Sequence, residues 1–391
     1  MRNVRFVYNG LAAKNPKLIG RKILDLPAPE YLARELKAFG TTDNQDMTKW
    51  TVELGDHLLF DRAGLGLLAD SLATYMGLAA EIKFHLRLDP DTYRNYYCLQ
   101  LDRHDEELSL PIVARRTGAR FSGAATIVVN LPAIRTALDF PIALRQPENG
   151  SLPTALLLPM QSEFDLLFAS QIALMTDLAI RVKKSPLTWV KAALSRRPGG
   201  FKKKASIFYR NIHPTADVHP TAVIEGSTIG PGARVGAHCV VRYSVIGENA
   251  RLHDGAKVEF SVVGRHSWLM HDLVLYRSLV EDQVFLIHGP YQFSYFQSSS
   301  AAFATIMMDY RPDGSPIKVK TEQGLKSYYG PFLGSVLQSG SKTLGGSLVA
   351  PGRIVPGNTW LSCSPDAIHF VTGKESGIGH SRPVFPASVQ Q

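Results

Sequence analysis

His288 and Tyr291, three positions apart, are the first residues in this sequence whose types and spacing could do chemistry. An imidazole titrates near neutrality, so it can accept a proton from an attacking nucleophile. A tyrosine hydroxyl can orient a substrate by hydrogen bonding. The alternative is a structural histidine at a turn, which must be the role of most of the seven histidines from His213 to His288.

Asp56 is a second candidate, because it follows a predicted strand over residues 50–54 and precedes a predicted helix over residues 63–75. Ligands of α/β sheets bind at the carboxyl ends of strands, where this carboxylate would lie. Gly-Asp is also a common dipeptide. By itself it favours a plain turn at the end of the strand.

The chain has 391 residues, 45% of them hydrophobic, which is enough for two domains with cores of their own. Its net charge of +9 comes from residues 181–204, which hold nine basic residues and no acidic one. The remainder balances, with 34 basic against 34 acidic residues. A nucleic-acid-binding protein would spread its basic residues over a docking face, so this distribution argues against a nucleic acid partner.

The three cysteines, Cys98, Cys239 and Cys363, lie far apart and cannot build a disulfide framework or a structural zinc site. The N-terminus lacks the apolar run of a signal peptide, and no later stretch is apolar enough for a membrane span. We therefore expect a soluble, cytoplasmic protein.

The basic segment predicts a helix that begins at Ser185-Pro186 and ends before residues 197–200. Leu187, Val190 and Leu194 give this helix one apolar face. It could contact an anionic membrane surface through residues 186–197. The alternative is a surface helix packed on its own domain, with solvated lysines that lead into a linker. We favour the second interpretation because a charge run is usually a solvated face.

An aliphatic residue recurs in steps of six, six and five from residue 212 to residue 280. The resulting 17-residue unit also appears in the similar segments 227–230, 244–247, 261–264 and 278–281, the last of which has Glu281 in place of glycine. Four positions after each of these aliphatic residues comes a second residue, which is usually small. The small residues are Ala216, Ala222, Ala233, Cys239, Ala250 and Ala256. The aliphatic residue and the residue four positions later are both predicted to point inward.

This period predicts a parallel β-helix over residues 211–368, in which each unit is one coil of a three-sided prism. Stacked coils satisfy their backbone hydrogen bonds with the coils above and below. We expect an insertion over 289–331 that interrupts the coils. A flexible tail is expected over 369–391, and a basic helix and linker over 185–210.

Residues 1–184 alternate strand-like and helical stretches, which predicts an α/β domain. The expected strands cover residues 4–8, 50–54, 79–86 and 125–131. The expected helices cover residues 28–39, 63–75 and 164–178.

The C-terminal half resembles the left-handed β-helix acyltransferases built from hexapeptide repeats. More specifically, it looks like the acetyltransferase half of the bifunctional enzymes that join a sugar-1-phosphate nucleotidyltransferase to a glucosamine-1-phosphate N-acetyltransferase. The likeness rests on His288-Gly-Pro-Tyr291, on Asp309-Tyr310 within residues 307–320, and on Gly324-Leu-Lys326. It implies a homotrimer with active sites between subunits, and acetyl-CoA or another acyl-CoA as co-substrate.

The resemblance also implies roles for single residues. His288 would be the general base and Tyr291 its neighbour at the sugar or phosphate. Asp309 and Tyr310 match an Asn-Tyr pair beside the thioester, and Lys326 lies near a lysine that contacts the substrate. Basic residues that bind the sugar phosphate have no clean counterpart, and Arg277 alone offers a charge there.

In the N-terminal half, residues 52–61 are similar to a nucleotidyltransferase strand that ends in Gly-Asp, which implies Mg²⁺ at Asp56. Residues 11–17 lack the glycines of the family's triphosphate-binding loop, so we expect a degenerate domain with weak or absent pyrophosphorylase activity.

The leading hypothesis is an N-acetyltransferase that acts on an amino-sugar phosphate or a nucleotide sugar. One alternative is nucleotidyltransferase activity in the N-terminal domain. Another is a catalytically decayed trimer that binds a nucleotide sugar or serves as a scaffold.

Overall fold

The computed structural model describes residues 4–8, 22–23, 26–39, 50–55, 57–92, 96–97, 99–100, 107–117, 123–137, 149–196, 199–321 and 324–362. The chain divides into two compact units. The first comprises Met1–Thr176 and Thr321–Pro331, and the second comprises Asp177–Lys320 and Phe332–Gln391. Each unit is described by itself.

The first unit is built on a mixed five-stranded sheet with the order β1-β4-β7-β6-β8. Its strands are β1 (Val4–Tyr8), β4 (Trp50–Leu54), β6 (Glu81–Arg87), β7 (Glu107–Arg116) and β8 (Ala124–Asn130). β1 pairs with β4 and β6 with β8 in parallel, whereas β7 is antiparallel to both of its neighbours. Alternate residues of β1 and β4 are buried, as a strand with one face on the core requires.

The helices of this unit are α1 (Ala28–Phe39), α2 (Arg62–Thr74), the short α3 (Pro90–Thr92) and α4 (Phe164–Lys183), which continues into the second unit. Shorter strands complete it: β2 (Lys22–Ile23), β3 (Leu26–Pro27), β5 (Leu58–Phe60), β9 (Ala133–Ala137), β10 (Asn149–Pro153) and β11 (Leu157–Pro159). Each predicted strand and helix of this half is confirmed to within a few residues at its ends, and so is the α/β class.

Two buried carboxylates hold the starts of helices in the first unit. Asp61 caps α2 by accepting from the backbone N–H of Gly64 at 2.8 Å and of Leu156 at 3.1 Å. Asp165 accepts from the N–H of Gln161 at 2.6 Å and of Ser162 at 2.7 Å. Burial raises the pKa of Asp61 to about 6 and of Asp165 to about 7, while these backbone hydrogen bonds favour the charged carboxylates.

The second unit starts with the end of α4, followed by α5 (Pro186–Leu194) and α6 (Phe201–Phe208). The helix predicted in the basic segment is confirmed as α5. α6 lies where we expected a linker. Among the described residues, no helix is both long and apolar enough to cross a membrane.

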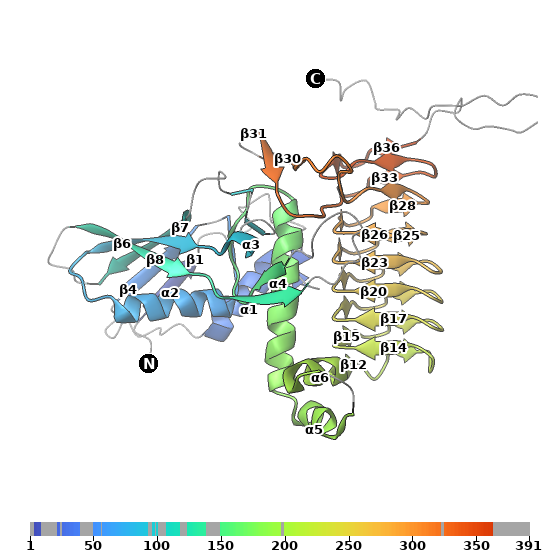
Figure 1. The fold of residues 1–391 in the computed structure, drawn as a ribbon, viewed down its shortest axis with the longest axis horizontal. Coiled ribbons are helices and arrows are strands. Elements are labelled where there is room, and N and C mark those ends of the chain that lie inside the picture. The colour runs from blue at the N-terminus through green and yellow to red at the C-terminus, as the bar shows by residue number, and fades with distance from the viewer. Residues whose placement is uncertain are drawn as a thin grey trace, which may run out of the picture. The chain divides into compact units, whose positions relative to one another are not determined.

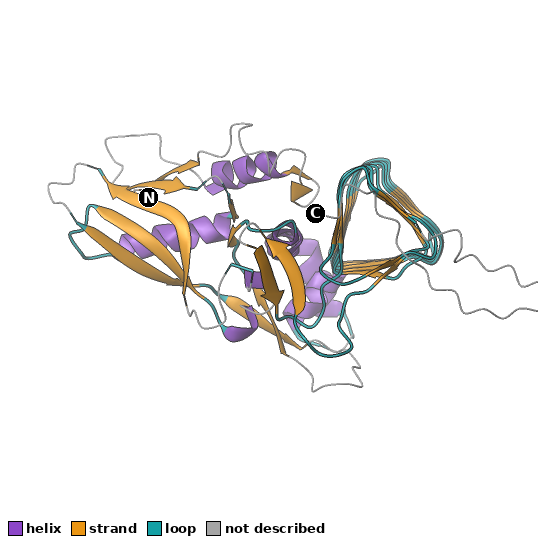
Figure 2. Ribbon diagram, turned by 90° about the horizontal axis from the view of Figure 1, so that it is seen from above, coloured by secondary structure: helices purple, strands orange, loops and turns teal. Residues whose placement is uncertain are grey.

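The rest of this unit is a parallel β-helix whose coils form a triangle when seen end-on (Figure 2). One side consists of β12 (Arg210–Ile212), β15 (Ser227–Ile229), β18 (Val245–Ile246), β21 (Val262–Val263), β24 (Leu279–Val280), β27 (Tyr295–Phe296), β32 (Val336–Leu337) and β35 (Ile354–Val355). We call this side face 1.

Face 2 consists of β13 (Asp217–Val218), β16 (Arg234–Val235), β19 (Arg251–Leu252), β22 (Trp268–Leu269), β25 (Phe285–Ile287), β28 (Ala301–Phe303), β33 (Lys342–Thr343) and β36 (Trp360–Leu361). Face 3 consists of β14 (Val223–Glu225), β17 (Val240–Arg242), β20 (Lys257–Glu259), β23 (Val274–Tyr276) and β26 (Tyr291–Gln292). These repeated parallel sheets confirm the predicted parallel β-helix and fit the left-handed form that the resemblance implies, and Figure 1 shows the coils stacked in chain order.

The interior of the prism holds the aliphatic residues of the repeat, as predicted. Ile229, Val235, Val241 and their equivalents form one continuous core from Ile224 to Leu361. The small residues also point inward: Ala233, Cys239, Ala250 and Ala256 are fully buried, while Ala216 and Ala222 are partly buried against the same core. Small side chains fit there because an interior at close packing leaves little volume near the corners.

The coils do not break at Gly289, contrary to our expectation. β26 pairs with β23, β27 with β24 and β28 with β25, so the winding continues. The register changes from 17 to 16 residues, as the pair Leu275↔Tyr291 shows, because the corner after β25 is one residue shorter.

The interruption follows β29 (Ile306–Met307), which pairs with the later strand β34 (Leu348–Val349). It carries the two-stranded sheet of β30 (Ile317–Thr321) and β31 (Gly324–Tyr328). Asp313-Gly314 forms a tight turn ahead of β30, with Gly314 N–H donating to Arg311 O at 3.0 Å. It is not the turn between the paired strands.

Candidate functional site

His288 lies at the corner between faces 2 and 3, directly after β25. Its side chain is exposed, and its backbone is left-handed with a φ of 63°. Four earlier coils make this corner with a longer turn, whereas here the chain turns sharply. A side chain on such a bend projects from the prism, so the imidazole can reach a ligand.

Tyr291 does not lie beside the His288 ring at the surface. Its side chain is fully buried, in the position that Leu275 fills in the coil below. Its hydroxyl donates to the carbonyl oxygen of Ile287 at 2.8 Å, and burial raises the pKa of the phenol well above its usual value. The predicted contact of this hydroxyl with a sugar is therefore wrong, because the hydroxyl faces the core. Its hydrogen bond instead fixes the backbone immediately before His288.

The corner that carries His288 also carries His271 and Asp254, each one 17-residue coil earlier. His253, at the end of β19, lies beside them, with its ring centroid 4.9 Å from that of His271. Sequence reasoning missed these residues, although their spacing from His288 was a usable signal.

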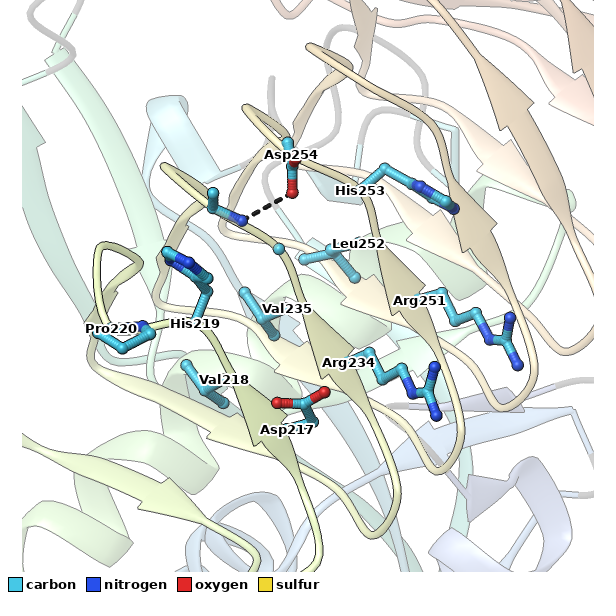
Figure 3. A pocket seen from close by; sticks show the side chains of 12 residues that line it. Asp217, Val218, His219, Pro220, Arg234, Val235, Arg251, Leu252, His253 and Asp254 are labelled. Carbon is cyan, nitrogen blue, oxygen red and sulfur yellow. Dashed lines mark hydrogen bonds between the residues drawn. The ribbon is translucent and has the colours of Figure 1, made fainter.

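A shallow groove runs along face 2 and this corner in the first three coils (Figure 3). Arg234 and Arg251 project from successive strands at one side of it, and His219, His253 and Asp254 lie at the corner side. Parallel strands stack about 5 Å apart, so His288, two coils beyond Asp254, is about 10 Å from the end of the groove.

Local contacts fix the shape of the groove. Asp254 Oδ1 accepts from the N–H of Ala237 at 2.8 Å. A Cβ at position 236 would lie 2.4 Å from the same oxygen, so only glycine fits there. The guanidinium of Arg251 lies 4.6 Å from the ring centre of Trp268, which holds this cation against the face.

Charged residues of both signs line the groove, with Arg234 and Arg251 against Asp217 and Asp254. Burial lowers the pKa of His253, and the neighbouring charges of His271 and Arg251 add to this effect against the opposing carboxylate of Asp254. A lowered pKa keeps the imidazole neutral near neutral pH. The two arginines and the two aspartates then balance, and the positive charge that an anionic ligand could meet is gathered at the side of Arg234 and Arg251.

Arg277 and Asp309 lie away from His288, at the corner between faces 3 and 1. The Arg277 guanidinium lies 5.6 Å from the ring centre of Phe260 and 5.9 Å from that of Phe293. Asp309 is partly buried, which raises the pKa of its carboxyl to about 6. Within one chain, face 3 separates these two residues from the imidazole.

The other predicted residues fall in different places. Tyr310 is 43% exposed at the start of the interruption. Lys326 lies on β31 and belongs to the first unit, whereas His288 belongs to the second. Asp56 lies outside the described residues, so magnesium binding there stays a prediction. Within the described ranges, no group of three or more histidine, cysteine, aspartate or glutamate side chains could hold a metal ion.

Several solved structures are similar to this chain. One is a hexapeptide transferase family protein from Anaplasma phagocytophilum, with 16% identity and a TM-score of 0.26 over 45% of this chain and 78% of that chain. Another is a mutant perosamine N-acetyltransferase from Caulobacter crescentus in complex with CoA and GDP-perosamine, with 12% identity and a TM-score of 0.22 over 42% of this chain and 56% of that chain.

A third is the acetyltransferase domain of PglB from Neisseria gonorrhoeae, with 13% identity and a TM-score of 0.20 over 45% of this chain and 58% of that chain. The chain thus spans less than two thirds of the second and third of these structures. No protein-family model and no curated protein matches it.

Proposed function

We propose that this chain is an acyltransferase that moves an acyl group from acyl-CoA to the amine of a sugar phosphate or nucleotide sugar, with His288 as general base. The observation that carries the proposal is the exposed imidazole at the one-residue-shorter corner of the solenoid. The hydrogen bond from Tyr291 to the Ile287 carbonyl supports it, because a base must be held in place to act.

The proposed reaction forms a C–N bond and breaks the thioester C–S bond. The amine attacks the acyl carbon and must lose a proton, which the His288 imidazole accepts. The imidazolium then returns the proton to the departing thiolate, so the base is regenerated and CoA leaves as the thiol.

The groove on face 2 is the proposed site for the anionic end of the acyl donor. Arg234 and Arg251 supply the positive charge that phosphate groups require. An extended pantetheine arm can span the two coils between the groove and His288, which brings the thioester to the imidazole.

The acceptor sugar requires residues that one solenoid does not collect around His288. Arg277, Asp309 and Tyr310 lie beyond face 3. In the homotrimer that the resemblance implies, the corner of one copy meets a face of the next. We propose that Asp309 and Tyr310 reach the site in that way, and that Arg277 contributes positive charge near the acceptor.

The test is a thiol-release assay with acetyl-CoA and a panel of amino-sugar phosphates and nucleotide sugars. We expect His288→Ala to lower kcat/KM by roughly a hundredfold or more, the usual contribution of a general base. His266→Ala is the matched control, because His266 is also an exposed corner histidine with a left-handed backbone, at a φ of 56°, but lies at the corner between faces 1 and 2. It should keep full activity.

Equal rates for the two variants would remove His288 from the mechanism. Binding of CoA or a nucleotide sugar by the unaltered chain, without thiol release for any acceptor, would instead favour the decayed binding or scaffold protein.

A further inference from the structure

The helix α5 exposes an apolar ridge. Leu187 is 62% exposed, Val190 53% and Leu194 80%. Residues three and four apart on a helix are neighbours on its surface, so these side chains form one strip along α5. A strip of large apolar side chains with this much exposure is typical of a surface that binds a protein or a membrane.

The opposite side of α5 is the one that packs. Thr188 and Ala192 are buried, and Ala192 joins a small core with Leu178, Val182 and Ala205. The indole of Trp189 donates to the Val182 carbonyl at 3.0 Å. The helix therefore packs on its own domain, as we expected, but not through the face that carries Leu187, Val190 and Leu194. The helix packs through the side opposite the ridge, so this packing does not use the side chains of the ridge.

The segment that carries the ridge is strongly basic. Arg181 pairs with Asp177, and Lys204 donates to the Ser195 carbonyl at 3.1 Å. The other described basic residues of segment 181–204 have exposed side chains, and the segment holds no acidic residue. These exposed residues are Lys183, Lys184, Lys191, Arg196, Lys202 and Lys203. Figure 1 shows α5 at the end of the second unit that carries the first coil.

We propose that α5 and the start of α6 form a docking surface for a membrane rich in anionic phospholipid. Apolar side chains on one strip, with lysines and arginines around them, are the composition of helices that lie in the plane of a bilayer interface. Leu187, Val190 and Leu194 enter the boundary between headgroups and acyl chains, and the ammonium and guanidinium groups contact lipid phosphates. An acidic protein would match the charge alone, whereas a lipid surface matches both the charge and the ridge.

The experiment is flotation of the full-length chain with vesicles. We expect the chain to float with vesicles of phosphatidylcholine and phosphatidylglycerol in equal parts, and to stay behind with pure phosphatidylcholine. Salt raised from about 0.1 M to about 1 M shortens the Debye length from about 10 Å to about 3 Å, so it should release most of the bound protein. Equal flotation with both vesicle types, or with neither, would overturn the proposal.

Variants separate the two contributions. Leu187→Glu combined with Leu194→Glu should lower the partition coefficient about tenfold or more, because it removes apolar contact and adds repulsion. Lys202→Glu combined with Lys203→Glu should have an effect of similar size that disappears at high salt.

The matched controls are Leu348→Glu and Lys257→Glu, which change the same residue types at exposed positions on the solenoid. They should float like the unaltered chain. All of these positions are exposed, so the variants should fold, and coincident thermal unfolding curves check this. Loss of flotation in the controls as well, or its retention in both α5–α6 variants, would contradict the proposal. A surface that binds a protein instead of lipid would give no flotation with either vesicle type.

Discussion

The burial of the Asp309 carboxylate destabilises the folded state near neutral pH. Burial is the largest cause and raises its pKa to about 6, against a usual value of 3.8, while the N–H of the same residue acts in the opposite direction. Because the folded state binds this proton more tightly than the unfolded state, its contribution to stability is fully present below about pH 4 and is lost as pH rises through about 6. The neutral asparagine that the resemblance implies here would escape this penalty.

We therefore predict that Asp309→Asn raises the free energy of unfolding near pH 7 by about 1–2 kcal/mol, after discounting the pKa shift for solvent screening. Near pH 4 the gain should vanish. Urea unfolding of both proteins at the two pH values measures it.

Asp313→Asn serves as the control of opposite sign. The Arg311 guanidinium, 2.6 Å from the Asp313 carboxylate, holds the pKa of that group below its usual value. Its replacement should lower stability near neutral pH. A gain for Asp309→Asn that is equal at both pH values would contradict the electrostatic explanation.

At the residue scale, the sequence predicts the corner position of His288 but not the burial of Tyr291. The 17-residue spacing places position 288 at a corner, where a side chain can project. It cannot show that the next coil is one residue shorter, and this single deletion decides that Tyr291, rather than Gln292, faces the core. The roles of Arg277, Asp309, Tyr310 and Lys326 depend on neighbours that are distant in sequence, so spacing alone could not group them.

At the scale of the coil, the serine of each repeat segment forms a hydrogen bond to the next coil. The N–H of Ser244 donates to Ser227 Oγ at 3.1 Å, that of Ser261 to Ser244 Oγ at 3.1 Å, and that of Ser278 to Ser261 Oγ at 3.0 Å. This ladder satisfies backbone groups at a corner where strand pairing is interrupted.

The glycine of the same segments allows coils to approach each other. A Cβ at position 247 would lie 2.9 Å from the carbonyl carbon of Gly264 in the next coil. The segment that lost this glycine has Glu281 instead, whose buried carboxylate accepts from the Tyr295 hydroxyl at 2.5 Å and from Ser298 N–H at 2.9 Å. The glutamate that replaces the glycine is thus satisfied by hydrogen bonds to Tyr295 and Ser298.

We predict that Gly247→Ala destabilises the chain by about 1–3 kcal/mol, the usual cost of overpacking, because backbone of the next coil must move. Gly345→Ala is the control within the same solenoid, since its new Cβ would lie 3.8 Å from Phe303 O, an ordinary contact. Chemical unfolding of both variants measures the difference. Equal stability would show that the coils can shift to accept the methyl group.

The helix α5 shows why a pattern can predict an element without its orientation. Apolar residues at i, i+3 and i+7 usually mark the buried face of a helix. Here the packed face uses Thr188 and Ala192, whose small volumes suit close packing, and the partly buried Trp189, whose indole N–H donates to the Val182 carbonyl. Both faces of α5 carry apolar residues, so the sequence of the helix alone does not show which face is buried. The elements that pack against the helix decide this.

For the whole molecule, the solenoid was predictable because each coil contacts only its neighbours, and one period therefore specifies the entire prism. The first unit was predictable only as α/β. Its sheet places β7 between β4 and β6, and this order depends on contacts between segments far apart in the sequence. Strand patterns carry no information about that order.

The most direct test of the central claim is a crystal structure of the full-length chain with acetyl-CoA. We predict three copies around a threefold axis, with the phosphates of the ligand beside Arg234 and Arg251. The thioester should lie at the His288 imidazole, close enough for an amine to be within about 2.6–3.2 Å of the ring nitrogen. Acetyl-CoA bound at a different surface, with the His288 ring open to solvent and far from the thioester, would contradict the account.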